Sequence, residues 1–258
     1  MTGLNGRDFA ESLLWDPAKV SRFETGKRLP SRDDLRDWAG ACHQPAAADE
    51  LLAQLSIIDD MYAAWRRQFR AGFGGRQRAS LSVEAHTQLF RIFECAMVPG
   101  LLQTPEYARL VYLKLVELYG FSDDVEEVVG LRMERQQVLY QPGHRFHFVI
   151  METALRQSFV PADVMRAQID RLVSVSTLRD VALGVIPLDV QLPVAPWHGF
   201  WLFDDRLVQV ETVSAELSVN EPDEIKMYAA TFKVMADCAV YGEAVRARLI
   251  EVQRGLAA

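Results

Sequence analysis

Apolar positions in the first forty residues recur at helical spacing and fall into three groups separated by short polar turns. The first group follows Asn5, a residue type that commonly caps helices, and contains Phe9, Ala10, Leu13 and Leu14. The second begins after Asp16 and Pro17, ends before Gly26, and contains Val20 and Phe23. The third follows Ser31 and contains Leu35, Trp38, Ala39 and Cys42. Three short helices with a turn of about three or four residues between the first two are typical of a helix-turn-helix.

A longer helical pattern over 45–70 predicts a connector between this segment and the rest of the chain. Its apolar side contains Leu51, Leu52, Leu55, Ile58, Met61, Tyr62 and Trp65. Arg66, Arg67 and Arg70 stand near its end, where we favour a solvated helix terminus over contact with a DNA backbone. The glycines that follow predict a hinge.

Beyond residue 75, helical and strand patterns alternate, which predicts a mixed α+β domain. Helices are expected over 76–88, from Pro105 after the cap Thr104, over 162–173, and in one long final helix from Glu221 through Leu249. Strands are expected over 89–95, 144–151, 181–187, 200–203 and 207–211. The last two should form a hairpin that turns at Asp204 and Asp205.

The predicted fold class is therefore α+β. An all-α helix-turn-helix domain with its connector occupies 1–70, and a mixed domain with a small β-sheet and a long C-terminal helix occupies 75–258. Of the 258 residues, 50% are hydrophobic and 24% are charged, which indicates a soluble globular protein. Apolar runs are too short for a membrane span and the first residues do not form a signal peptide, so we expect a cytoplasmic protein without a membrane partner.

The net charge of −7 would argue against a nucleic-acid partner, but the charge is unevenly placed. Residues 1–78 carry 12 Lys and Arg against 11 Asp and Glu, so the remainder of the chain holds the whole negative excess. Within the first part, residues 16–32 have a local charge of +3. The overall charge therefore does not decide which partners the chain binds.

The string LNGRDFAESLLWDPAKVSRFETGKRLPS, residues 4–31, resembles the DNA-binding domain of the lambdoid-repressor (Xre) family, with its pattern VSRxExGxRxPS. In that family the second helix of the pair lies in the major groove. The resemblance implies base contacts from Pro17, Ala18, Lys19 and Arg22, with Arg22 the best candidate for a bidentate contact to guanine. It implies phosphate contacts from Asn5, Gly6, Arg7, Lys27 and Arg28. Taken singly, the charged residues of this set are also compatible with ordinary exposed side chains that bind nothing.

The sequence departs from that family at its start, because members usually have another helix before the segment that begins at Leu4. Without such a helix, apolar surface on Phe9, Leu13 and Trp38 should be uncovered, at a cost of ~25 cal/mol per Å². We therefore expect either a weakly stabilised domain or a natural start upstream of Met1.

A second resemblance rests on VPGLLQTPEYAR, residues 98–109, and LRMERQ, residues 131–136. Both are similar to motifs of the C-terminal domain attached to such helix-turn-helix modules in many actinobacterial, antitoxin-like regulators. Those proteins are often encoded beside a small acidic partner protein, which the resemblance implies as a partner here. Arg132, Glu134 and Arg135 are interpreted as charges paired within one helix rather than as catalytic groups.

Candidate chemistry is sparse. Cys42, Cys95 and Cys238 are too far apart in sequence for a metal-binding pair, and the spacing of the histidines does not suggest a metal site. Catalytic or nucleotide-binding motifs are also missing, so we expect no catalytic residue, no metal and no cofactor. Two features remain open. Glu152, Glu211 and Glu221 could converge near His198, and the loop 188–199 could cover a ligand or partner, although a loop packed by its own Trp197 is favoured.

The sequence thus predicts a non-enzymatic transcriptional regulator that binds double-stranded DNA as a homodimer, while its acidic domain receives a protein or an effector. One alternative is an antitoxin-type protein-interaction module that binds DNA only weakly. The other is a ligand-binding or enzymatic domain fused to a vestigial helix-turn-helix.

Overall fold

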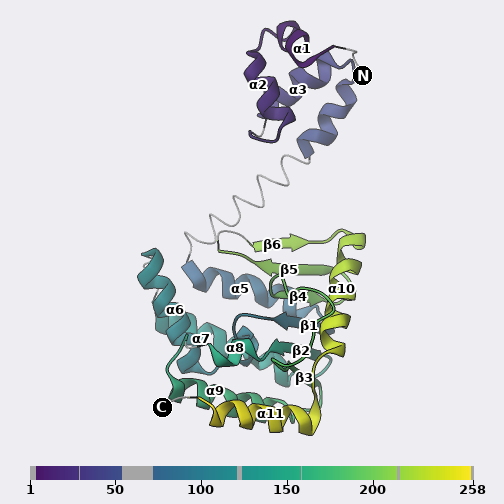
Figure 1. Cartoon of the computed structure of the whole chain (residues 1–258). Helices are drawn as coiled ribbons and strands as arrows, with labels where there is room; N and C mark the ends of the chain where they lie inside the picture. Colours follow the sequence, from purple (N-terminus) through teal and green to yellow (C-terminus); the bar gives the residue numbers. More distant parts are fainter. Residues whose placement is uncertain are drawn as a thin grey trace. The chain divides into compact units, whose positions relative to one another are not determined.

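In the computed structural model, the described residues are 4–28, 30–53, 72–120, 124–157, 159–213 and 216–256, without the side chains of 72–76 and 79. The chain divides into two compact units, Met1–Ala64 and Trp65–Ala258, here called the N-terminal and C-terminal units. Figure 1 draws their helices and strands. The predicted connector is helical over 45–53; the rest of it, including Arg66, Arg67 and Arg70, lies outside the described residues.

The N-terminal unit contains the short helices that the capping residues predict: α1 (Gly6–Ser12), α2 (Pro17–Glu24) and α3 (Arg32–Ala41). Asn5 Oδ1 accepts from the backbone N–H groups of Arg7 and Asp8, each at 3.0 Å. Asp16 caps α2 through the N–H of Ala18, at 2.9 Å, and Ser31 forms a capping box at the start of α3. Local capping therefore determines where these helices begin.

The turn between α1 and α2 differs from the sequence interpretation at Leu14. We placed Leu14 on the apolar side of the first helix, but it follows the helix end with φ of 56° and is 96% exposed. The N–H of Trp15 bonds to Ala10 O and the N–H of Leu14 to Glu11 O, which is the Schellman pattern. In this pattern the residue just after the helix end has left-handed backbone angles and is commonly glycine. Here that residue is Leu14.

A small aromatic core holds these helices together. Phe9 is 6% exposed and its ring lies 4.7 Å from that of Trp38, between centroids. Trp15 and Phe23 pack beside Trp38, with centroids 6.1 Å from it in each case. The expectation that Phe9 would be uncovered was wrong, because Trp38 of α3 packs against it.

The C-terminal unit is a mixed α+β structure, which confirms the predicted class (Figure 1). Its helical elements are α5 (Gly72–Ala85), η1 (Gly100–Leu102), α6 (Pro105–Tyr119), α7 (Val125–Arg135), η2 (Gln136–Tyr140), α8 (Thr153–Arg156), α9 (Ala162–Val175), α10 (Pro222–Asp237) and α11 (Gly242–Arg254). Its strands are β1 (Leu89–Glu94), β2 (Arg145–Met151), β3 (Val181–Ile186), β4 (Phe200–Phe203), β5 (Leu207–Glu211) and β6 (Glu216–Val219).

The sheet has six strands in the order β3-β2-β1-β4-β5-β6, and is larger than expected. Strands β1, β2 and β3 are parallel, whereas β4, β5 and β6 extend the sheet as antiparallel neighbours. The sequence analysis missed β6, whose four residues are partly or fully exposed and have no buried face. Alternate residues of the strands serve two cores. One contains residues of α9 and α11, and the other, on the opposite face, contains residues of α10.

The predicted single C-terminal helix is wrong, because α10 ends at Asp237 and α11 begins at Gly242. Between them, Val240 exchanges two backbone hydrogen bonds with Val185 of β3, of 2.9 and 3.1 Å. Gly242 then adopts φ of 61°, a conformation that glycine reaches without steric cost. The chain thus leaves the helix to pair with the sheet edge.

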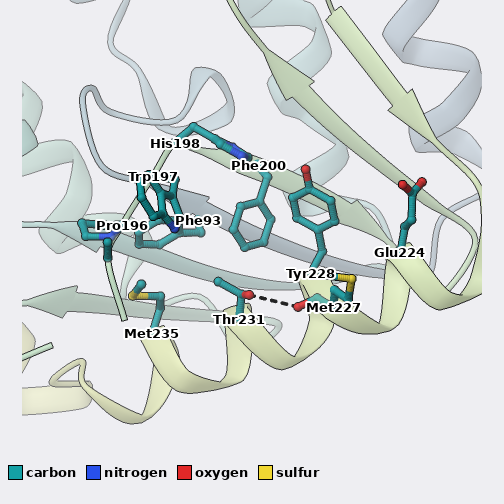
Figure 2. A pocket seen from close by; sticks show the side chains of 11 residues that line it. Phe93, Pro196, Trp197, His198, Phe200, Glu224, Met227, Tyr228, Thr231 and Met235 are labelled. Carbon is teal, nitrogen blue, oxygen red and sulfur yellow. Dashed lines mark hydrogen bonds between the residues drawn. The ribbon is translucent and has the colours of Figure 1, made fainter. Parts of the chain in front are cut away.

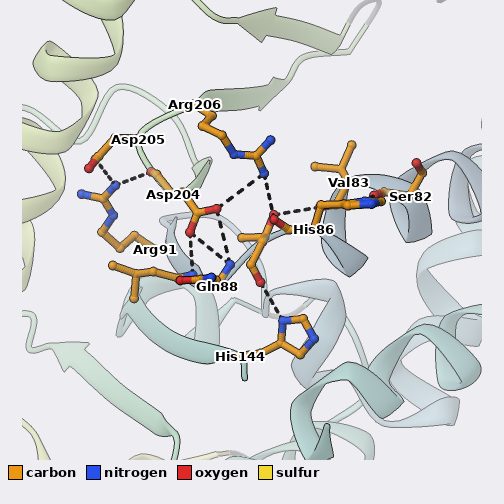
Figure 3. Close-up of polar contacts among 11 residues, drawn as sticks. Ser82, Val83, His86, Gln88, Arg91, His144, Asp204, Asp205 and Arg206 are labelled. Atoms are coloured by element: carbon orange, nitrogen blue, oxygen red, sulfur yellow. Dashed lines mark hydrogen bonds and ion pairs between the residues drawn. The ribbon is translucent and has the colours of Figure 1, made fainter. Parts of the chain in front are cut away.

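The predicted hairpin between β4 and β5 is confirmed, and its turn is tied to the start of β1 (Figure 3). Asp204 Oδ1 accepts from the N–H groups of Leu89, at 2.8 Å, and Gln88, at 3.1 Å. Arg91 pairs with Asp205 at 2.7 Å, and Arg206 donates to His86 O at 3.1 Å. These contacts fix the register between β1 and β4.

Candidate functional site

The exposed side of α2 carries three of the four side chains that we expected at DNA bases. Pro17 and Ala18 are exposed in its first turn, and Arg22 is exposed one turn later. Among the described residues, Arg22 has no ion pair or side-chain hydrogen bond in this structure. Its guanidinium is therefore available for a bidentate contact.

Lys19, the fourth expected base contact, points into the N-terminal unit. Its Nζ lies 2.5 Å from Asp34 Oδ1 and 3.7 Å from the centroid of the Trp15 ring. Burial raises the pKa of Asp34, but hydrogen bonds from Lys19 and from Ser31 outweigh it and leave the pKa below its ordinary value. Lys19 therefore joins α2 to α3.

The five expected phosphate contacts lie at the ends of α1 and α2. Asn5 caps α1 and also donates to Asp8 Oδ2 at 2.9 Å, and Arg7 lies 3.5 Å from Glu11. Gly6 is packed near Glu24, since a Cβ built on it would lie 3.4 Å from Glu24 Oε2.

Lys27 and Arg28 are exposed, and their N–H groups both donate to Arg22 O, at 2.9 and 3.2 Å. Gly26, with φ of 67°, allows this tight turn. The fold thus brings Arg22, Lys27 and Arg28 together at the end of α2.

In the C-terminal unit, the motifs 98–109 and 131–136 pack against each other. Arg132 Nη1 donates to Gln103 Oε1 at 2.6 Å, and Gln103 Nε2 donates to Val98 O at 2.8 Å. Gln136 Nε2 donates to the carbonyls of Gly100, at 2.9 Å, and Gln103, at 2.8 Å. These two motifs thus serve first of all to join η1 to α7.

The interpretation of Arg132, Glu134 and Arg135 as charges paired within one helix was wrong for both arginines. Arg132 bonds to Gln103, as above. Arg135 lies 2.5 Å from Glu84 of α5, and the side chains of this pair are 10% and 2% exposed. Sequence spacing favoured neighbours on the same helix, whereas the fold supplies partners from other elements.

A small polar cavity of about 50 Å³ lies beside these motifs and contains a glutamate that sequence reasoning missed. It is lined in part by Glu94, Gln103, Arg132, Trp201 and Glu211. Burial raises the pKa of Glu94 to about 8; the hydrogen bond from Trp201 Nε1, at 2.8 Å, lowers it, and the charge of Glu211 raises it. The sequence signal that could have pointed to Glu94 is its position as an acidic residue at the end of an apolar strand.

A second, largely apolar cavity of about 280 Å³ lies between the residues before β4 and α10 (Figure 2). Trp197 at its edge is 86% exposed, so the interpretation of the loop as packed by its own tryptophan was wrong. Phe200 and Tyr228 form its centre, with rings 5.1 Å apart between centroids. The acid that lines it is Glu224.

The three glutamates whose convergence near His198 the sequence left open do not gather there. Glu152 is 1% exposed and pairs with Arg156, at 2.5 Å, and Arg248, at 2.9 Å. Glu211 lines the polar cavity, and Glu221 precedes α10. Glu152 thus links the end of β2 to α11.

Among the described residues, His, Cys, Asp and Glu form no group of three or more that could hold a metal ion. In the same part of the chain, none of the helices combines the length and apolar character needed to cross a bilayer. Cys42, Cys95 and Cys238 are free, half-buried thiols.

The family model described as "Domain of unknown function (DUF5753)" matches residues 77–251, more than half of the chain. No curated protein and no solved structure matches the chain. The match includes the six-stranded sheet, both cavities and the motifs that join η1 to α7. The chain therefore belongs to the DUF5753 family.

Proposed function

We propose that this protein is a sequence-specific, DNA-binding transcriptional regulator that resembles the Xre family in its N-terminal unit. The observation that carries the proposal is Arg22, exposed on α2 and close to Lys27 and Arg28 after the Gly26 turn. A helix with an exposed arginine, followed by basic residues, suits the major groove with phosphates on either side.

Base recognition is assigned to Pro17, Ala18 and Arg22. Lys19 has a positioning role, because its bond to Asp34 and its contact with Trp15 fix α2 on α3. Lys27, Arg28 and the start of α1 from Asn5 to Arg7 are assigned to phosphates, which supply affinity without sequence preference. Such modules bind paired half-sites about 34–36 Å apart, so we propose a homodimer on DNA.

The C-terminal unit is proposed to receive the signal, because its largely apolar cavity beside α10 offers a site for a ligand or partner. The proposed partner is the small acidic protein that the family resemblance implies, or an effector molecule. The protein is proposed to act in the cytoplasm and to catalyse no reaction.

A protein-interaction module with weak DNA binding is the second candidate. Trp197, 86% exposed, and Met227, 70% exposed, favour it, because large exposed apolar side chains are common at binding surfaces.

The test is selection of genomic DNA fragments by the purified full chain at two salt concentrations. The proposed regulator recovers fragments that share a sequence pattern, and its affinity for them persists at the higher salt concentration. Recovery of unrelated fragments whose binding disappears at higher salt would contradict sequence-specific binding and favour the interaction module.

A further inference from the structure

The apolar cavity beside α10 has the walls of a small-molecule site. Its volume of about 280 Å³ is close to the lower limit of ligand pockets, ~300–1,000 Å³. Phe93 and Met235 are fully buried where they line it, whereas Trp197 and Met227 are largely exposed at its edge. A ligand seated here would cover apolar surface that is now open to water.

The aromatic rings surround the cavity in a definite arrangement. Phe200 and Tyr228 meet edge to face at 67°, and the His198 ring lies 6.0 Å from Tyr228 between centroids. Figure 2 shows Phe200 between Trp197 and Tyr228, with Glu224 beyond Tyr228. Aromatic faces carry a negative quadrupole and attract cations.

The polar groups of the cavity also favour a cation. Among its described lining residues there is no lysine or arginine, and Glu224 supplies a carboxylate. That carboxylate is close enough to Tyr228 to raise the pKa of the phenol, in addition to the larger effect of burial. His198 Nδ1 lies 3.0 Å from Gly199 O, and because a carbonyl oxygen can only accept, Nδ1 is the donor in this contact.

We propose that this cavity binds a small amphipathic amine, a monocation with an apolar body. The body lies between Trp197 and Met235, and the ammonium group lies near the Tyr228 ring and the Glu224 carboxylate. The proposal concerns the C-terminal unit alone and does not depend on whether the N-terminal unit binds DNA.

Three probes with the same phenylethyl body test the charge requirement by calorimetry on the full chain at neutral pH. They are 2-phenylethylammonium, 2-phenylethanol and 3-phenylpropionate. We expect the ammonium to bind about fivefold more tightly than the alcohol, an advantage of about 1 kcal/mol that comes mainly from the Glu224 carboxylate and in smaller part from the Tyr228 ring. We expect the carboxylate probe to bind most weakly. Equal affinities, or no saturable binding by any of the three, would overturn the proposal.

Two variants locate the site. Glu224→Gln should remove most of the preference for the ammonium and leave the affinity for the alcohol unchanged, because only the charge is lost. Trp197→Ala should weaken binding of both probes, and its exposed position makes a folding defect unexpected. Glu243→Gln, in α11 with a side chain 97% exposed, is the matched control. An ammonium preference that survives Glu224→Gln, or unchanged affinities of both probes in Trp197→Ala, would place the site elsewhere and overturn the assignment.

Discussion

The two units differ in how much core supports their functional surfaces. In the N-terminal unit, the described core is one cluster around Phe9, Ala10 and Val20, and a lysine reaches into its aromatic part. In the C-terminal unit, apolar side chains fill both faces of a six-stranded sheet. Hydrophobic stabilisation scales with buried apolar area, so the smaller unit depends more on each polar contact. The exposed face of α2 therefore depends on few interactions.

Among the substitutions proposed, Asp34→Ala is expected to cause the largest loss of stability. This change leaves Lys19 without its carboxylate and removes half of the capping box at α3, for a total of about 3 kcal/mol. We expect the N-terminal unit to lose its cooperative thermal transition, and with it DNA binding. Asp33→Ala is the control, because Asp33 is an exposed neighbour that pairs with Arg36 of the same helix.

The corresponding change in the larger unit sharpens the comparison. Arg135→Ala leaves Glu84 buried without its guanidinium, again at a cost of about 3 kcal/mol. Here we expect a lower transition temperature for a unit that still unfolds cooperatively, as followed by calorimetry. The opposite result would be that Arg135→Ala abolishes the transition of the C-terminal unit while Asp34→Ala keeps the transition of the N-terminal unit. It would show that the larger core tolerates the loss of an ion pair less well than the smaller one.

Glu94 gives the C-terminal unit a distinctive pH dependence. Its ordinary pKa is 4.5 and burial raises the folded-state pKa to about 8. Between these values the folded state keeps a proton that the unfolded chain releases. The free energy of unfolding therefore falls as pH rises through this window, by at most about 1.4 kcal/mol per pH unit, and this loss is complete above pH 8.

Glu94→Gln cannot ionise and keeps an oxygen that accepts from Trp201. Urea unfolding of this variant at pH 5 and pH 8 should show a smaller decrease in stability than in the parent chain. An equal decrease in both proteins would show that Glu94 is not the group responsible.

The smallest change in stability is expected for a substitution in the turn before α2. Leu14→Gly relieves a left-handed leucine and should stabilise the N-terminal unit by about 0.5 kcal/mol, after allowance for the greater freedom of glycine in the unfolded chain. A slightly higher transition temperature of that unit is the expected result, whereas a lower one would indicate that the exposed leucine makes a stabilising contact.

Local features were predictable from the sequence, and long-range ones were not. The caps Asn5, Asp16 and Ser31 and the turn at Asp204 act within a few residues or between adjacent strands, so their patterns could be read directly. Lys19 and Arg135 find their carboxylates on other helices, 15 and 51 residues away. No spacing rule indicates such partners, and for the same reason the apolar cavity and the role of Glu94 became visible only in the folded chain.

The most direct test of the central claim compares Arg22→Ala and Lys27→Ala in the full chain, on a selected DNA site and on random DNA over a range of salt concentrations. The account predicts that Arg22→Ala weakens specific binding by about 1–3 kcal/mol and changes random binding less. It predicts that Lys27→Ala weakens both equally and reduces the salt dependence. Equal losses on both DNAs for Arg22→Ala would contradict the assignment of α2 as the helix that reads the bases.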